Sequence, residues 1–369
     1  MLRRIIAAGT LLSVSLLVAF LLGEGALRLL AAAGYQPARR VAAADPSAVK
    51  VQPFGAFGYR QRPGARLRYG NGTVATANRQ GFRGPDVAIP KPAGTFRIIL
   101  LGESSTHGFN VNDNQTIDAF MRADLAAQRS DLRVDVVNLA YDGYDAYQMW
   151  QRLLVDGVPL RPDLIIVNAG ANDVRNAHFA SRGDPDPRTL IWEGEMRRQR
   201  AEIARGGPTL WTQIKHLSYL ARLPGIIREN LAGQRVARRE RAAPGPYPDA
   251  ANNFARNIER IADVAGRLEV PLILSTPPSA LLLGDAPPME PRSYWVVNRE
   301  VTQRYRDTLA ARMRRIAAQR LRDGQPVRYE AFYLPGTLFL DDVHLTPQGN
   351  RAMAANFVDA VTPFLPRRR

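Results

Sequence analysis

The chain has 369 residues, of which 46% are hydrophobic and 23% are charged. It is therefore long enough for one large α/β domain or two smaller domains, and its composition excludes a wholly disordered chain and a multi-span membrane protein. The absence of cysteine excludes disulfides and thiolate chemistry, and the net charge of +16 is spread over scattered residues without a nucleic-acid-binding motif, so we predict no nucleic-acid partner.

The N-terminus carries an uncharged apolar run, Ile5 to Gly23, which follows Arg3 and Arg4. As a helix this run would span about 28 Å, close to the hydrocarbon thickness of a bilayer. We therefore expect residues 1–30 to form an uncleaved transmembrane anchor. A signal peptide is the competing interpretation, because Ala31 to Ala33 offer small residues for cleavage. A short basic tail before a single span favours export, so we expect the following domain on the periplasmic or extracellular side.

Residues 31–95 are rich in glycine, proline and arginine and lack sustained periodicity. This composition is typical of a linker, here with short strands such as the one expected between Arg66 and Val74. From Phe96 the pattern changes, and we expect one folded domain over residues 96–366.

Short apolar runs alternate with helix-like stretches in that domain. The expected strands are Arg97–Leu101, Val134–Leu139, Leu164–Ala169, Pro271–Ser275 and, more weakly, Val327–Leu334. The expected helices are Asn114–Gln128, Tyr144–Val155, Asn252–Leu268, Val297–Leu321 and Gln348–Phe364. Buried strands that alternate with helices are typical of a parallel sheet covered on both faces. We therefore predict an α/β domain with a parallel sheet of about five strands.

Residues 176–249 do not follow this alternation and are predicted to be an insertion. The segment is rich in arginine and includes a mixed apolar and basic stretch, Trp211 to Leu231. An insertion after a strand can cap a site or lie near a membrane. A solvated helical excursion that packs on the domain fits the sequence equally well.

A candidate nucleophile follows the first strand of the domain, in the tetrad Gly102-Glu103-Ser104-Ser105. A tight turn between a strand and a helix places a serine at the carboxyl edge of the sheet, where open α/β folds hold their sites. Gly-x-Ser alone is a weak signal, and a helix-capping serine is the ordinary interpretation. Position 106 is not glycine, so the Gly-x-Ser-x-Gly pattern of α/β-hydrolases is not met.

A candidate base lies near the C-terminus. Asp341 precedes His344 by three residues, in a loop after the last expected strand. A carboxylate at this spacing can bind Nδ1 of the histidine and leave Nε2 to accept a serine proton. The other histidines, His107, His178 and His216, lack this arrangement. A lone loop histidine is more often structural, so His344 is a convincing base only together with the other candidate site residues.

Two further turns follow the second and third strands. Gly143 offers a backbone N–H group and Asn172 a side-chain carboxamide, and both groups are suited to stabilising an oxyanion. Separately each is an ordinary turn. Together, the four turns supply a nucleophile, two donors and an acid–base pair to one edge of one sheet.

These residues, in this order, resemble the four blocks of the SGNH/GDSL esterase and lipase superfamily, which are centred on Ser, Gly, Asn and His. The resemblance covers Phe96 to Phe364. It implies a flavodoxin-like three-layer α/β/α domain that hydrolyses acyl esters without a metal or cofactor. Its implied catalytic residues are Ser104, Asp341 and His344, and its implied oxyanion hole comprises Ser104, Gly143 and Asn172. Glu103 departs from the family pattern, which usually has aspartate there.

The sequence resembles membrane-anchored bacterial members of the superfamily that are found with surface polysaccharides, which suggests acetyl esters on extracytoplasmic glycans as substrates. Three alternatives stay open. The same site would serve an O-acyltransferase, in which a sugar hydroxyl replaces water. The basic insertion would suit a lipid esterase that lies on the bilayer. The fold would also suit a non-catalytic binding or assembly module.

Overall fold

A five-stranded parallel sheet forms the centre of the protein. The computed structural model describes residues 1–35, 38, 51–69, 71–174, 193–227, 248–280 and 299–367. The strands are β5 (Thr95–Gly102), β6 (Arg133–Asn138), β7 (Leu164–Asn168), β8 (Leu272–Ser275) and β9 (Val327–Glu330), in the order β6-β5-β7-β8-β9. All of the neighbouring pairs are parallel. The predicted α/β fold is confirmed, and β9 is shorter than the expected Val327–Leu334.

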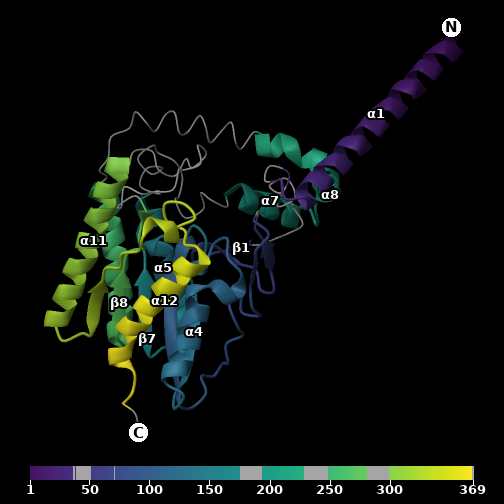
Figure 1. The fold of residues 1–369 in the computed structure, drawn as a ribbon. Helices are drawn as coiled ribbons and strands as arrows, with labels where there is room; N and C mark the ends of the chain where they lie inside the picture. Colours follow the sequence, from purple (N-terminus) through teal and green to yellow (C-terminus); the bar gives the residue numbers. More distant parts are fainter. Residues whose placement is uncertain are drawn as a thin grey trace.

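Helices cover both faces of this sheet (Figure 1). One face packs against α4 (Ile117–Gln128) and α12 (Pro347–Val361) through residues such as Ile98 and Leu100 of β5. The other face packs against α5 (Ala146–Arg152), α10 (Pro248–Arg267) and α11 (Arg299–Arg322) through Ile99 and Leu101. Successive strand side chains point to opposite faces, so the continuous apolar sequence of β5 fills both cores.

Two β-hairpins precede the domain, within the segment expected to be a linker. The first pairs β1 (Val51–Phe54) with β2 (Gly58–Gln61), and the second pairs β3 (Arg66–Arg68) with β4 (Val74–Thr76). The first hairpin is packed rather than free, because Val51, Phe57 and Tyr59 form a buried cluster with Tyr141 and Tyr144. The segment therefore contributes directly to the surroundings of the sheet edge.

The N-terminal helix α1 (Leu2–Ala32) projects away from the domain (Figure 1). Residues Ile6–Ala32 are long and apolar enough to cross a membrane, and none of their most apolar stretch is buried. Within the insertion, the structure describes α7 (Glu193–Ala204), α8 (Leu210–Leu217) and a helical stretch at residues 219–227. Residues 176–192 and 228–247 of the predicted insertion, including His178, lie outside the described residues.

Candidate active site

Ser104 lies at the carboxyl end of β5, as the sequence predicted. The strand ends at Gly102, and the short helix α3 (Ser104–His107) begins after the single intervening residue Glu103. A Cβ atom at Gly102 would collide with the Thr106 side chain, so glycine allows the chain to turn this tightly. The turn directs the Ser104 hydroxyl toward the loop that follows β9.

Ser104, His344 and Asp341 form a chain of hydrogen bonds. The Ser104 Oγ lies 2.8 Å from Nε2 of His344, and Nδ1 of the same ring lies 2.6 Å from Oδ2 of Asp341. The second Asp341 oxygen accepts the backbone N–H groups of Val343 and His344 at 3.0 and 2.8 Å. The carboxylate thus shapes its own loop and orients the imidazole, which is the geometry that a serine nucleophile and its base require.

The pKa of His344 is raised above its ordinary value of 6.5. Burial is the largest single effect and lowers this pKa. The negative charge of Asp341 and its hydrogen bond to the ring raise the pKa, and together with the other nearby carboxylates they outweigh burial. For the same reason the pKa of Asp341 is lowered despite burial. Asp341 therefore stabilises the charged imidazolium form of His344, which is the form that results when His344 accepts the Ser104 proton.

Glu103, the residue before Ser104, is buried and binds the turn that carries Asn172. Its carboxylate accepts the backbone N–H groups of Gly170 at 2.6 Å, Ala171 at 2.7 Å and Asn172 at 2.7 Å. Burial raises the pKa of Glu103 to about 7, against the lowering effect of these N–H groups and of Arg306. This carboxylate therefore joins the serine turn to the asparagine turn.

Asn172 and Gly143 lie in neighbouring turns. The Asn172 carboxamide donates to the backbone carbonyl of Tyr144 at 3.0 Å. The Tyr144 N–H donates to Tyr141 at 3.2 Å and closes a turn in which Gly143 has a φ of 85°. Only glycine adopts this backbone conformation without strain. The Asn172 amide thus has a fixed orientation beside the Gly143 turn.

The ends of β6 and β7 are also tied to α3. The Asn138 carboxamide donates to the Thr106 carbonyl at 3.1 Å, and the Asn168 carboxamide donates to the Thr106 hydroxyl at 3.0 Å. All three side chains are buried. Because buried and satisfied polar networks hold one geometry, these bonds fix the helix that begins at Ser104.

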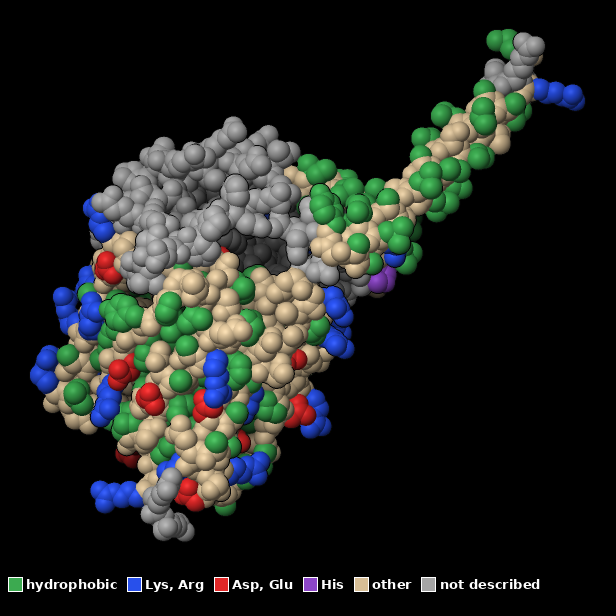
Figure 2. Space-filling model, viewed as in Figure 1, with side chains coloured by type: hydrophobic (Ala, Val, Ile, Leu, Met, Phe, Trp, Pro, Cys, Tyr) green, Lys and Arg blue, Asp and Glu red, His purple; other side chains and the backbone are tan. Residues whose placement is uncertain are grey.

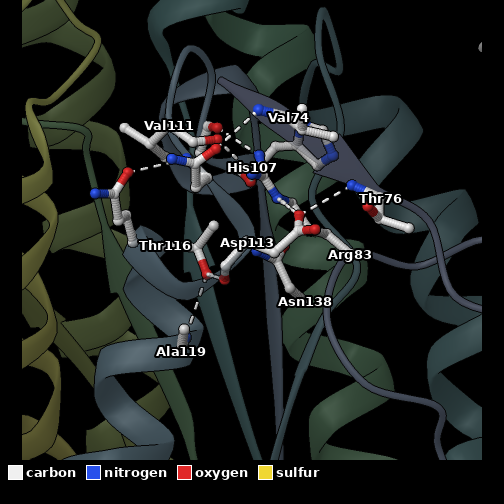
Figure 3. A network of polar contacts seen from close by, with 12 residues as sticks. Val74, Thr76, Arg83, His107, Val111, Asp113, Thr116, Ala119 and Asn138 are labelled. Carbon is white, nitrogen blue, oxygen red and sulfur yellow. Dashed lines mark hydrogen bonds and ion pairs between the residues drawn. The ribbon is translucent and has the colours of Figure 1, made fainter. Parts of the chain in front are cut away.

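Arg83, which follows the second hairpin, holds the loop after α3 (Figure 3). Its guanidinium is fully buried and donates to the backbone carbonyls of His107, Gly108 and Val111, and it pairs with Asp113 at 3.2 Å. Asp113 in turn accepts the backbone N–H of Thr76 in β4 at 2.9 Å. The loop 108–113 is therefore held by a residue from the segment that sequence analysis treated as a linker.

That loop places Phe109 against the histidine. The rings of Phe109 and His344 have centroids 4.4 Å apart with an interplanar angle of 34°, and the rings of Tyr69 and Phe109 have centroids 5.0 Å apart. These aromatic rings limit the positions open to the imidazole. Sequence analysis missed Phe109 and Arg83, since only the tertiary fold brings them to the site.

A second histidine–aspartate pair lies behind the site. The His107 Nδ1 is 3.0 Å from Oδ1 of Asp142, and both residues are buried. The His107 ring packs edge-on against Tyr141, with centroids 5.0 Å apart. The neighbouring Ser105 hydroxyl is buried without a hydrogen-bond partner in the described part of the chain. Of the two adjacent serines, Ser104 is therefore the one that contacts a histidine.

The match to a known protein family agrees with the chemistry of this site. The GDSL-like lipase/acylhydrolase family model matches residues 100–352, so the chain belongs to this family of carboxylic ester hydrolases. Similar solved structures include a GDSL-like lipase from Bacteroides thetaiotaomicron, with 17% identity over 73% of this chain and 89% of that chain and a TM-score of 0.38. An acetylxylan esterase from Geobacillus stearothermophilus shares 14% identity over 74% of this chain and 97% of that chain, with a TM-score of 0.40. No curated protein sequence matches.

Proposed function

We propose that the protein is a membrane-anchored serine esterase in which Ser104, His344 and Asp341 act as a catalytic triad. The observation that carries this proposal is the pair of contacts at 2.8 and 2.6 Å that joins the three side chains. In the reaction, the Ser104 oxygen attacks the ester carbonyl carbon while Nε2 of His344 takes the hydroxyl proton. His344 then protonates the leaving alcohol, and water releases the acid from the acyl-enzyme.

The proposed oxyanion hole consists of the backbone N–H groups of Ser104 and Gly143 and the Asn172 carboxamide. Supporting this assignment, Glu103 positions the Asn172 turn directly beside the nucleophile. The bond from the Asn172 side chain to Tyr144 also fixes the amide before substrate arrives. Donors that need no rearrangement stabilise the developing negative charge more effectively than water does.

The proposed substrates are acetyl esters on a polysaccharide outside the cytoplasm. This part rests on the resemblance to anchored bacterial members of the family and on α1, which has the length and hydropathy of a membrane span. The positive tail at Arg3 and Arg4 favours export of the domain.

The test measures acyl preference and acceptor preference of the full-length protein in detergent. The probes are p-nitrophenyl esters of increasing chain length and acetylated xylan, with acetate release as the readout. We expect the highest rate for acetyl and no activity in Ser104→Ala. Rates that rise with chain length would support a lipid esterase instead, and acetyl transfer to an added sugar would support a transferase. Equal rates in Ser104→Ala and wild type would contradict the proposal.

A further inference from the structure

The described part of the insertion exposes an apolar stripe on α8. Leu210, Trp211, Ile214 and Leu217 are 72%, 53%, 39% and 70% exposed. At the helical rotation of about 100° per residue, these four side chains fall within an arc of about 120°. Thr212 and His216 lie on the opposite side of the helix, and Lys215 lies at the edge of the stripe, about 40° beyond Trp211. Figure 2 shows hydrophobic side chains on this part of the insertion, next to those that cover α1.

The end of α8 is joined to α1 by a set of polar contacts. The Glu24 carboxylate accepts the backbone N–H groups of Tyr219 at 2.9 Å and Leu220 at 3.0 Å, and the Ser218 hydroxyl at 2.9 Å. These groups lie at the start of the helical stretch 219–227, where backbone N–H groups lack helical partners. Glu24 therefore caps a helix of the insertion from a different part of the chain.

Neighbouring residues of α1 extend this contact. Arg28 donates to the Leu217 carbonyl at 2.5 Å, and its guanidinium lies 4.6 Å from the centre of the Tyr219 ring. At Gly23 a Cβ atom would lie 3.2 Å from the Leu220 side chain, so the small residue permits close packing. We call this set, Gly23, Glu24 and Arg28 with residues 217–220, the anchor contact.

The anchor contact fixes where α8 lies along α1. Glu24 directly follows the apolar run that begins at Ile5, about 28 Å along the helix axis, which is close to one hydrocarbon thickness. In the proposed anchored protein, the contact thus lies at the boundary between hydrocarbon and headgroups. The apolar stripe of α8 begins beside this boundary, and Lys215 supplies positive charge on the same helix.

We propose that α8 lies in the headgroup region of the phospholipid bilayer that α1 crosses, with its apolar stripe toward the acyl chains. This inference rests on the proposed membrane anchor. An amphipathic helix with aromatic and leucine residues on one face and basic residues on the other is the form that binds such an interface. The partner is lipid rather than protein because the stripe is continuous with a segment that is itself suited to lipid.

Further hydrogen bonds connect α8 to the domain that carries the proposed site. The Thr212 hydroxyl of α8 donates to Glu202 of α7 at 3.2 Å, and Gln199 of α7 donates to the carbonyl of Val51 in β1 at 2.8 Å. Val51 belongs to the buried cluster that includes Tyr141 and Tyr144, which flank Asp142 and Gly143. Through α7, these bonds link α8 to the domain that carries the proposed site.

The absence of native cysteine makes single-cysteine spin labelling the direct test. Full-length Leu210→Cys, His216→Cys and Leu16→Cys are labelled with a nitroxide and placed in vesicles of phosphatidylethanolamine and phosphatidylglycerol. Leu210 tests the apolar stripe, His216 is the matched control on the opposite face, and Leu16 reports the anchor. The readout is collision with oxygen, which concentrates in lipid, against collision with a water-soluble nickel chelate.

We expect the labels at positions 16 and 210 to collide mainly with oxygen and the label at 216 to collide mainly with nickel. If the label at 16 is in lipid while those at 210 and 216 are equally open to nickel, the inference is overturned and the anchor stands. A label at 16 that is open to nickel overturns the anchor and the inference together. In Glu24→Gln, the distance distribution between labels at 16 and 210 should broaden, and an unchanged distribution would contradict the assigned function of the anchor contact.

Discussion

The carboxylate of Glu103 accepts the backbone N–H of Asn172 at 2.7 Å. The residue that precedes the proposed nucleophile therefore also holds the proposed oxyanion donor. The two oxygens of the Glu103 side chain reach three consecutive N–H groups. This relationship makes the serine and asparagine turns one rigid unit, so a change at Glu103 should alter catalysis without removing a reacting group.

Glu103→Gln should lower both stability and turnover. Glutamine keeps the size but places an NH₂ group where an N–H donor now points, so the free energy of unfolding should fall by about 2 kcal/mol. We expect kcat to fall more than KM rises, because the oxyanion donor moves while substrate binding elsewhere persists. Urea unfolding and steady-state kinetics check this. Glu103→Asp, which keeps the charge, is the matched variant and should lose less. Wild-type stability and kcat in Glu103→Gln would contradict the claim that the Glu103 carboxylate positions the Asn172 turn.

Asp341→Asn should change the pH dependence of hydrolysis as well as its rate. Only neutral His344 can accept the Ser104 proton, so kcat/KM rises with pH through the pKa of His344, which lies above 6.5 in the wild type. The substitution removes the charge that raises this pKa, and the acidic limb should move to lower pH. It also favours the wrong tautomer, which should reduce kcat by up to about 10⁴-fold. Asp342→Asn, at the adjacent carboxylate, is the control and should retain most activity. An unmoved acidic limb in Asp341→Asn would argue against the pairing.

Asn172→Ala should reduce kcat by about 10²- to 10³-fold with a small effect on KM, because the amide acts on charge that develops in the transition state. Asn172→Asp is nearly isosteric but replaces a donor with a negative charge, so its kcat should be lower still. Circular dichroism of both variants separates this effect from unfolding. A kcat within a few-fold of wild type in both would remove Asn172 from the oxyanion hole.

Arg83→Lys should loosen the loop that presents Phe109 to His344. Lysine keeps the charge but lacks the planar fork that reaches three carbonyls, and buried acceptors left without partners should cost about 2 kcal/mol of stability. Turnover should fall because the imidazole loses its aromatic neighbour. The matched control is Arg79→Lys, since the Arg79 side chain is exposed and, in the described part of the chain, forms a surface ion pair with Asp86; we expect a change below about 1 kcal/mol there. Equal stability of the two variants would contradict the assigned function of Arg83.

The sequence was most informative where local pattern and function coincide. Strand β5 was predicted to within a few residues because it is apolar on both faces, and the parallel topology then placed Ser104, Gly143, Asn172 and the His344 loop at one edge. The hydrogen bond between Ser104 and His344 joins residues 240 positions apart and was inferred only through that topology.

The missed features depend on contacts that no local pattern encodes. Arg83 is one of many arginines, and its sequence neighbourhood resembles a linker. Its importance comes from burial against the loop after α3. Likewise, Glu24 ended the apolar run in the sequence, while its bonds to residues 218–220 require the insertion to fold back onto α1. Tertiary contacts at such long range are visible only in the folded chain.

The most direct test of the central claim is covalent labelling of the full-length protein with a fluorophosphonate, followed by peptide mapping. The account predicts one adduct, on Ser104, that is absent in Ser104→Ala and retained in Ser105→Ala, because the Ser104 hydroxyl bonds to His344 while the Ser105 hydroxyl has no partner among the described residues. An adduct on Ser105, or none on a correctly folded protein, would contradict the proposed nucleophile.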